Sequence, residues 1–222
     1  MKNDFELTDS FKHKGLRRRL VEIVRSKGIK DESVLRAIAS VPRHLFLDSA
    51  FHELAYEDQA MPIDAEQTIS QPYTVAYQTE MLAVEEGHKI LEIGLGSGYQ
   101  ACVLLELGAI VYSIERIQVL YEKAKEFLPL INYNPHIFIG DGTLGLPEHA
   151  PFDRIIVTAA APEIPKPLAE QLIVGGIMII PIGNRNVQTM YKITKKSKTE
   201  FEQKALDSFR FVPLVGKQGW KV

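Results

Sequence analysis

The segment LEIGLGSGYQ carries glycines at alternate positions, Gly94, Gly96 and Gly98. It lies between an apolar run that predicts a strand and another that predicts a helix. Glycines in such a turn let the backbone bend sharply and approach a ligand closely. A dinucleotide fingerprint would need its third glycine where Tyr99 stands. The spacing therefore disfavours a dinucleotide and leaves two interpretations, a different ligand or a tight turn without one.

Acidic residues end the next two predicted strands. Glu115 closes VYSIE, and Asp141 follows HIFIG and precedes Gly142. A carboxylate at the first of these places can accept hydrogen bonds from the two hydroxyls of a ribose. Because the carboxyl ends of parallel strands meet at one edge of a sheet, we expect these residues beside the glycine loop. The alternatives are a solvent-facing glutamate and an ordinary Asp-Gly turn.

A polar segment, DAEQTISQPYTVAYQT at residues 64–79, precedes the glycine loop. Hydroxyl and amide side chains dominate it, and Ser70 is one of them. A solvated loop is one interpretation, and a substrate-facing segment is the other. Ser70 also fits as the cap of a helix that begins near Pro72.

Strands and helices alternate from residue 88 onward, and the strands are continuously apolar, which is typical of a parallel sheet covered on both faces. The predicted strands span residues 88–94, 109–116, 136–142, 152–160 and 175–183, and the predicted helices span 98–108, 117–130 and 165–173. Beyond residue 186, VQTMYKIT alternates as a half-buried strand does, and residues 201–214 are its antiparallel neighbour. The predicted fold class is α/β, a Rossmann-like doubly wound and mostly parallel sheet with helices on both faces.

The N-terminal part is predicted to be helical. Apolar residues recur at helical spacing over residues 12–27, and Asp31 can cap a second short helix that Pro42 stops. We expect residues 1–60 to be an N-terminal helical addition to a catalytic core of residues 61–222. Since no linker is long enough to separate domains, residues 1–222 are predicted to form a single domain. His44 has no second metal-type ligand at a useful spacing, so we expect a structural or exposed histidine.

Composition disfavours several classes of protein. The chain has 222 residues and a formal net charge of −2, which gives no electrostatic reason to bind nucleic acid or an anionic membrane. The single cysteine, Cys102, excludes an internal disulfide and a cysteine zinc cluster. The charged N-terminus lacks the apolar stretch of a signal peptide, and no apolar run approaches the ~18 residues of a membrane span. We expect a soluble, cytoplasmic monomer that binds no metal, nucleic acid or membrane.

Five segments together resemble the protein-L-isoaspartate O-methyltransferase family of class I S-adenosylmethionine-dependent methyltransferases. They are QTISQPY, LEIGLGSGYQA, IER, GDG and FDRIIVTAAAPEIP, and the similarity runs from about Val41 to FVPLVGKQGW. The resemblance implies an enzyme that moves the methyl group of S-adenosylmethionine to the free α-carboxylate of L-isoaspartyl residues in damaged proteins, leaving S-adenosylhomocysteine. The ester then collapses to a succinimide, which reopens in part to normal aspartate.

The resemblance also implies roles for individual residues. Ser70 corresponds to the family's active-site serine, and Thr68, Ile69 and Ser70 would line the cleft beside the methyl donor. Asp141 would face the exocyclic amine of adenine, and the N–H of Gly142 would face a ring nitrogen. The full set implied to bind the cofactor is Thr68, Ile69, Glu92, Gly94, Gly96, Gly98, Glu115, Arg116, Asp141, Gly142 and Thr158.

The implied reaction suits an uncharged polar segment. An isoaspartyl carboxylate has a pKa near ~4, so it is ionised at neutral pH and needs no general base. What it needs is alignment with the methyl group and loss of water from the attacking oxygen. The Ser70 hydroxyl can orient one carboxylate oxygen, whereas an Arg or Lys would stabilise the ground state more than the transition state. The resemblance and this chemistry favour the substrate-facing interpretation of residues 64–79.

Three positions depart from the family's pattern. Val215 stands where a Thr is frequent, Val75 where some members have a His, and Leu95 where a Thr or Asp is usual. Each puts an apolar side chain where a polar contact to cofactor or substrate is expected. Two other functions therefore stay open, a cofactor-binding homologue without turnover and a class I methyltransferase with a small-molecule acceptor.

Overall fold

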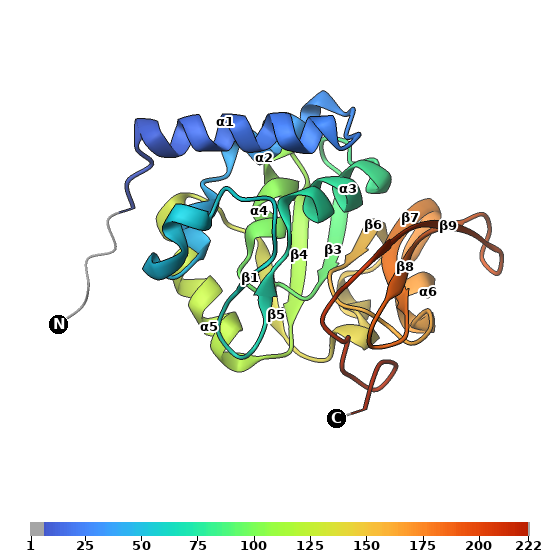
Figure 1. Cartoon of the computed structure of the whole chain (residues 1–222). Helices are drawn as coiled ribbons and strands as arrows, with labels where there is room; N and C mark the ends of the chain where they lie inside the picture. The colour runs from blue at the N-terminus through green and yellow to red at the C-terminus, as the bar shows by residue number, and fades with distance from the viewer. Residues whose placement is uncertain (1–6, 222) are drawn as a thin grey trace.

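A computed structural model describes residues 7–221, and its centre is a seven-stranded sheet with the strand order β5-β4-β3-β6-β7-β8-β9 (Figure 1). The strands are β3 (Lys89–Ile93), β4 (Ile110–Glu115), β5 (His136–Ile139), β6 (Phe152–Val157), β7 (Leu172–Gly183), β8 (Gln188–Lys195) and β9 (Phe201–Phe209). Pairing from β5 through to β7 is parallel, and β8 and β9 continue the sheet antiparallel. This architecture confirms the predicted doubly wound, mostly parallel sheet with C-terminal antiparallel strands.

Later strands are added to the sheet on both sides of β3. It runs outward through β4 and β5, and it then returns to place β6 on the other side of β3. The carboxyl ends of these parallel strands lie at one edge of the sheet. The strand order reverses direction between the neighbouring strands β3 and β6, and such a topological switch point is where open α/β sheets bind ligands.

Helices cover both faces because successive strand residues point to opposite sides. Ile90 and Ile156 face one core with α3, α4 and α5, and their neighbours Leu91 and Ile155 face the other with α6. These helices are α3 (Pro72–Leu82), α4 (Tyr99–Glu106), α5 (Gln118–Phe127) and α6 (Lys166–Glu170). The last is shorter than the predicted helix 165–173, because Leu172 already pairs with Phe152 in the sheet.

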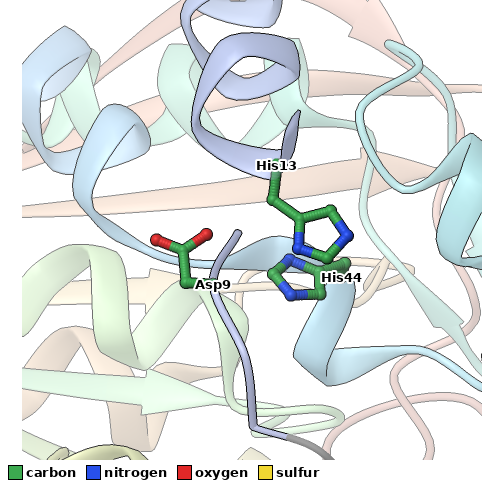
Figure 2. Close-up of side chains that lie close together, drawn as sticks. All are labelled: Asp9, His13 and His44. Carbon is green, nitrogen blue, oxygen red and sulfur yellow. The ribbon is translucent and has the colours of Figure 1, made fainter. Parts of the chain in front are cut away.

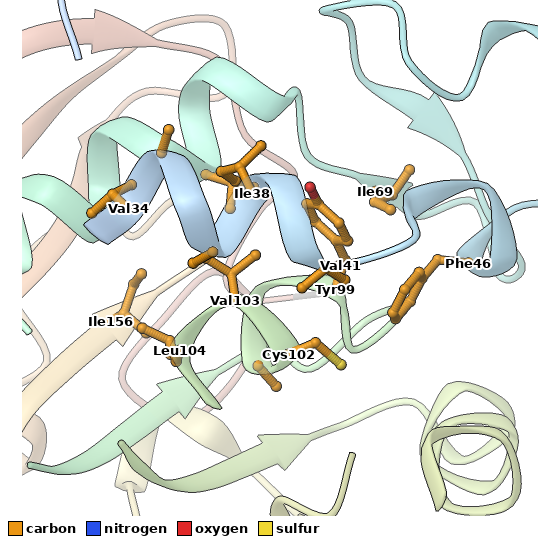
Figure 3. Close-up of a cluster of buried hydrophobic side chains, with 14 of the residues drawn as sticks. Val34, Ile38, Val41, Phe46, Ile69, Tyr99, Cys102, Val103, Leu104 and Ile156 are labelled. Atoms are coloured by element: carbon orange, nitrogen blue, oxygen red, sulfur yellow. The ribbon is translucent and has the colours of Figure 1, made fainter. Parts of the chain in front are cut away.

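The N-terminal helices α1 (Phe11–Ser26) and α2 (Glu32–Ser40) form an outer layer over α3 and α4 (Figure 1). Val34 and Ile38 of α2 pack against Val103 and Leu104 of α4 in a fully apolar contact (Figure 3). Short elements complete the chain: η1 (Arg43–Phe46), η2 (Ser49–Leu54), β1 (Met61–Pro62), β2 (Thr68–Ile69), η3 (Leu128–Ile131), η4 (Gly142–Leu144) and η5 (Pro147–His149). Residues 1–6 of the predicted helical addition and residue 222 of the predicted single domain lie outside the part of the chain that the structure describes. Within residues 7–221, no helix is long and apolar enough to cross a membrane.

A polar cluster fastens the start of α1 to η1. Its members Asp9, His13 and His44 lie close together (Figure 2), and the ring centroids of the two histidines are 3.7 Å apart. Arg17 donates to both oxygens of Asp9 at 3.0 and 2.9 Å, and the Tyr56 hydroxyl lies 2.7 Å from Nδ1 of His44. We call these five residues the N-terminal anchor. No spacing in the sequence indicates it, because folding brings its members together from separate elements.

His44 is buried in this anchor, as the expected structural role requires. Burial, with a smaller contribution from the adjacent His13, lowers the pKa of His44 to about 4. Because Arg17 already occupies both oxygens of Asp9, the carboxylate stabilises the anchor through an ion pair.

Candidate active site

The glycine loop follows β3 and leads into α4. Gly94, Gly96 and Gly98 have φ angles of 94°, 55° and 86°, a region in which residues with a side chain are strained. An added Cβ at Gly94 would also lie only 2.6 Å from Oγ1 of Thr158. The Thr158 hydroxyl donates to the Gly94 carbonyl at 2.7 Å, which fixes the loop against the end of β6. The loop therefore presents bare backbone at the ligand edge of the sheet.

Glu115, at the end of β4, holds the other side of this loop. One carboxylate oxygen accepts the N–H of Gly96 at 2.8 Å, and the other accepts the N–H groups of Arg116 and Ile117 at 2.7 and 2.8 Å. The side chain is buried, with 5% of the residue exposed. A carboxylate offers about four acceptor positions, so one remains for a ligand hydroxyl.

A pocket of about 170 Å³ lies between the glycine loop and the ends of β4 and β5. We call it the glycine-loop pocket. Its walls are Gln67, Thr68, Ile93, Gly94, Gly96, Ile114, Glu115, Arg116, Ile117, Leu120, Gly142, Ala159 and residues 212–215. The structure therefore brings Thr68, Gly94, Gly96, Glu115, Arg116 and Gly142, all predicted site residues, to one place.

A larger cavity of about 710 Å³ adjoins this pocket. We call it the Ser70 cleft. It is lined by Lys27, Ala60, Thr68, Ser70, Gln71, Tyr73, Thr74, Thr158, Val187 and residues 208–212. Thr68 and Val212 line both cavities, so the glycine-loop pocket and the Ser70 cleft share a wall. A ligand in one can therefore meet a ligand in the other beside Thr68.

Ser70 lies in the cleft between β2 and α3. The alternative in which it caps α3 is wrong, because the cap residue is Gln71 and the N–H of Tyr73 instead donates to Asp58 at 2.8 Å. Asp58 also accepts a hydrogen bond from the Gln71 side chain at 3.0 Å, so its carboxylate stabilises the start of the helix. The Ser70 hydroxyl is therefore not required for the helix start.

Four predicted cofactor residues line neither cavity, and they are Ile69, Glu92, Gly98 and Asp141. Ile69 is buried in the core that Figure 3 shows, so only its neighbours Thr68 and Ser70 face the cleft. Gly98 begins α4 behind the loop. Glu92 is fully buried and accepts a hydrogen bond from Ser113. Burial raises the pKa of Glu92 to about 8, although the Ser113 hydrogen bond opposes this shift. Ile69 in β2 and Glu92 in β3 point to the core because alternate strand residues face opposite sides, and their contacts to the cofactor stay predictions.

Asp141 also lies outside the lining of the glycine-loop pocket. One oxygen accepts from the N–H and hydroxyl of Thr143 at 3.0 and 2.6 Å, and the other accepts the N–H of Lys217 at 2.8 Å. Burial acts to raise the pKa of Asp141, but these hydrogen bonds outweigh it and lower the pKa. Asp141 thus ties the C-terminal segment to the ligand edge, and its contact to adenine stays a prediction.

The C-terminal segment, residues 208–215, lines more of the site than the sequence indicated. Residues 212–215 line the glycine-loop pocket, and the N–H of Leu214 and the carbonyl of Val212 pair with Ala160 at 2.7 and 2.8 Å. The only local signal was the motif FVPL. Of the three departures, Val75 and Leu95 are buried in the core, and Val215 alone lines the pocket. Val215 is therefore the one departure that places an apolar side chain in the pocket wall where the family frequently has a hydroxyl.

Comparison with known proteins agrees with this geometry. The model of the family "Protein-L-isoaspartate(D-aspartate) O-methyltransferase (PCMT)" matches residues 15–219. A protein-L-isoaspartate O-methyltransferase from Cytophaga hutchinsonii is 55% identical over 214 residues, which cover 96% of this chain and 97% of that protein. One from Dictyoglomus turgidum is 54% identical over 218 residues, which cover 98% of this chain and 99% of that protein.

Two solved structures are similar over most of the chain. A protein-L-isoaspartate O-methyltransferase superposes with a TM-score of 0.82 at 31% identity, covering 91% of this chain and 67% of the other. A β-aspartate methyltransferase from Plasmodium falciparum, in complex with S-adenosyl-L-homocysteine, superposes with a TM-score of 0.78 at 26% identity. That match covers 90% of this chain and 98% of the other.

Proposed function

The chain belongs to the protein-L-isoaspartate (D-aspartate) O-methyltransferase family, and we propose that it transfers the methyl group of S-adenosylmethionine to the free α-carboxylate of L-isoaspartyl residues in damaged proteins. The observation that carries this proposal is the shared wall at Thr68 and Val212. It sets a pocket built on the glycine loop beside a cleft that holds Ser70. A methyl donor and a peptide acceptor need such adjoining sites.

The glycine-loop pocket fits S-adenosylmethionine by the chemistry of its walls. Glu115 offers an acceptor for a ribose hydroxyl, and Gly94 and Gly96 line the pocket without a side chain. Ile117 and Leu120 add apolar surface for a flat base. Gly142 packs closely against Ile93 in the pocket wall, because an added Cβ at Gly142 would lie 2.6 Å from the Ile93 side chain. Bound there, S-adenosylmethionine supplies an electrophilic methyl group on a sulfonium.

Ser70 acts on the acceptor in this proposal. The isoaspartyl carboxylate has a pKa near ~4 and arrives ionised, so no residue has to remove a proton. The Ser70 hydroxyl donates a hydrogen bond to the non-reacting oxygen and so turns the other oxygen toward the methyl group. Thr68, which lines both cavities, limits how the carboxylate can approach. Alignment of this kind can supply several kcal/mol of rate acceleration, with a ceiling of roughly 7–11 kcal/mol.

The cleft suits an anion that must lose its water. Among its lining residues there is no aspartate or glutamate to repel the incoming carboxylate. Tyr73, Phe209 and Phe211 provide apolar surface that displaces solvent from the attacking oxygen. Removal of water strengthens the hydrogen bond from Ser70 and raises the reactivity of the carboxylate.

The methyl ester is the product that begins repair. The backbone nitrogen of the next residue attacks the ester carbonyl, loses its proton and expels methanol, which closes a succinimide ring. Water then opens the ring at either carbonyl and gives aspartyl or isoaspartyl peptide. These steps need no residue of this chain, so the enzyme's task ends with the ester.

Damaged proteins and peptides are therefore the proposed partners. We infer that the chain works as a cytoplasmic monomer that binds neither nucleic acid nor membrane. The net charge of −2 supports the absence of a polyanion partner.

A methyl-transfer assay with matched peptides tests the proposal. An L-isoaspartyl peptide and its aspartyl twin are incubated with the enzyme and S-adenosylmethionine, and methyl ester is measured. We expect turnover of the isoaspartyl peptide alone. Equal turnover of both peptides would contradict the proposed acceptor and favour another class I methyltransferase. Binding of the donor by calorimetry without any turnover would favour a homologue that has lost catalysis.

A further inference from the structure

The Ser70 cleft carries a positive charge that the proposed reaction does not use. Among the described residues, Lys27 and Arg210 are the charged ones that line it. Lys27 is paired with Asp58, which also accepts the N–H of Tyr73 at the start of α3. Arg210 takes part in none of the ion pairs within residues 7–221. The unpaired positive charge that the Ser70 cleft offers a ligand is therefore that of the Arg210 guanidinium.

The backbone that carries Arg210 is held on both sides. Phe209 packs on Tyr77 with ring centroids 5.1 Å apart. The N–H of Phe211 donates to Oε1 of Gln188 at 2.8 Å. Arg210 itself is exposed between these two anchored residues. Its position along the cleft is thus fixed while its guanidinium stays available to a ligand.

The reacting carboxylate is a poor partner for this guanidinium. Its negative charge is lost as the ester forms, so a tight ion pair there would stabilise the ground state more than the transition state. A second carboxylate on the same peptide keeps its charge throughout. The planar guanidinium can bind such a group through two parallel hydrogen bonds.

We propose that Arg210 is a specificity-determining residue that makes the Ser70 cleft favour isoaspartyl peptides with a second carboxylate near the reacting one. The inference rests on the proposed function, because it names the substrates that the same cleft prefers. The second carboxylate is either an adjacent acidic side chain or a nearby peptide C-terminus, since both present the same chemistry. Because the ion pair is exposed, we expect a preference of roughly threefold to fivefold in KM that weakens with added salt.

Steady-state kinetics with three isoaspartyl peptides of one length test this inference. The first is amidated and has uncharged neighbours around the isoaspartyl residue, and we call it the neutral peptide. The second is amidated with a glutamate next to the isoaspartyl residue. The third has the uncharged neighbours of the first and a free C-terminus close to the isoaspartyl residue. We expect a lower KM for one or both carboxylate-bearing peptides, with kcat unchanged, and the responding peptide identifies the source. Arg210→Gln removes the difference in KM between the three peptides.

Arg185→Gln is the matched control. The Arg185 guanidinium lies over the Trp220 ring, 5.4 Å from its centroid, and lines neither cavity. This variant keeps the wild-type preference. Equal KM values for all three peptides in the wild type, or a preference that survives Arg210→Gln, would overturn the role of Arg210.

Failure of this inference is distinguishable from failure of the proposed function. Turnover of the neutral peptide by the wild type reports methyl transfer itself. If no peptide is turned over, binding of the three fluorescently labelled peptides is measured in the presence of S-adenosylhomocysteine. Tighter binding of a carboxylate-bearing peptide to the wild type than to Arg210→Gln still supports the inference, and equal binding of all three to the wild type contradicts it.

Discussion

The carboxylate of Glu115 joins two parts of the site before any ligand binds. Its hydrogen bonds to the N–H groups of Gly96, Arg116 and Ile117 connect the glycine loop to the end of β4. The same carboxylate is the acceptor that we assign to a ribose hydroxyl. A change at this residue therefore affects the shape of the loop and the contact to the ligand together.

Replacing Glu115 tests whether its carboxylate binds the donor. We expect Glu115→Ala to weaken binding of S-adenosylhomocysteine by ~1–3 kcal/mol, the range for losing hydrogen bonds to a charged group. Isothermal titration calorimetry measures the change, and Glu126→Ala, an exposed glutamate on α5, is the control. An affinity equal to that of the wild type would place the donor away from Glu115.

Ser70 is tested through turnover. Because its hydroxyl orients the acceptor and the donor is bound elsewhere, Ser70→Ala should lower kcat roughly tenfold or more while donor affinity stays the same. Ser70→Thr keeps a hydroxyl and should restore part of the rate. Full activity of the alanine variant on an isoaspartyl peptide would show that the hydroxyl plays no part in the reaction.

Individual residues were predictable where a backbone requirement fixed the residue type. Gly94 and Gly96 need positive φ angles, and Glu115 ends a strand at the ligand edge, so each left a local pattern. Ile69 and Glu92 left none that distinguishes lining the site from lying behind it. Whether a side chain in a strand faces the pocket or the core depends on the elements that pack on each face of the sheet.

At the scale of elements, the start of α3 shows how distant segments position the site. Asp58 precedes the helix in the chain, yet it accepts the N–H of Tyr73, the side-chain amide of Gln71 and the ammonium of Lys27. This fixes the turn that presents Ser70 to the cleft. The sequence predicted a helix near Pro72 correctly, but the carboxylate that stabilises its start could not be found from local spacing.

The N-terminal anchor makes α1 sensitive to acid. His44 is 1% exposed, and the groups that face it are the Thr8 carbonyl, Asp9, His13, His52 and Tyr56. Its pKa is about 4 in the folded chain and near 6.5 when unfolded, so between these values only the unfolded chain binds the proton. The resulting stability is present above pH ~6.5 and is lost as the pH falls toward 4, at a cost of up to about 3 kcal/mol.

Urea unfolding at several pH values measures this effect. The free energy of unfolding of the wild type should fall between pH 6.5 and 4.5 more steeply than that of His44→Gln, which cannot take up the proton. His136→Gln, an exposed histidine at the start of β5, should keep the wild-type slope. Parallel curves for wild type and His44→Gln would contradict a depressed pKa at His44.

At the scale of the whole molecule, the proposed acceptor site is built from segments that lie far apart in the sequence. The Ser70 cleft takes Lys27 from the end of α1, Thr158 from the end of β6, Val187 from the turn before β8, and residues 208–212 from the end of β9. The alternation of apolar runs predicted the parallel sheet and its ligand edge. The cleft could not be predicted in the same way, since its walls come from segments that only meet in the folded chain.

The central claim is that the methyl donor and the peptide acceptor meet at the shared wall of Thr68 and Val212. A crystal structure with S-adenosylhomocysteine tests this claim most directly. We predict that the ligand lies in the glycine-loop pocket, with its ribose on Glu115 and its sulfur directed into the Ser70 cleft. A ligand bound elsewhere, or one whose sulfur faces away from Ser70, would contradict the account.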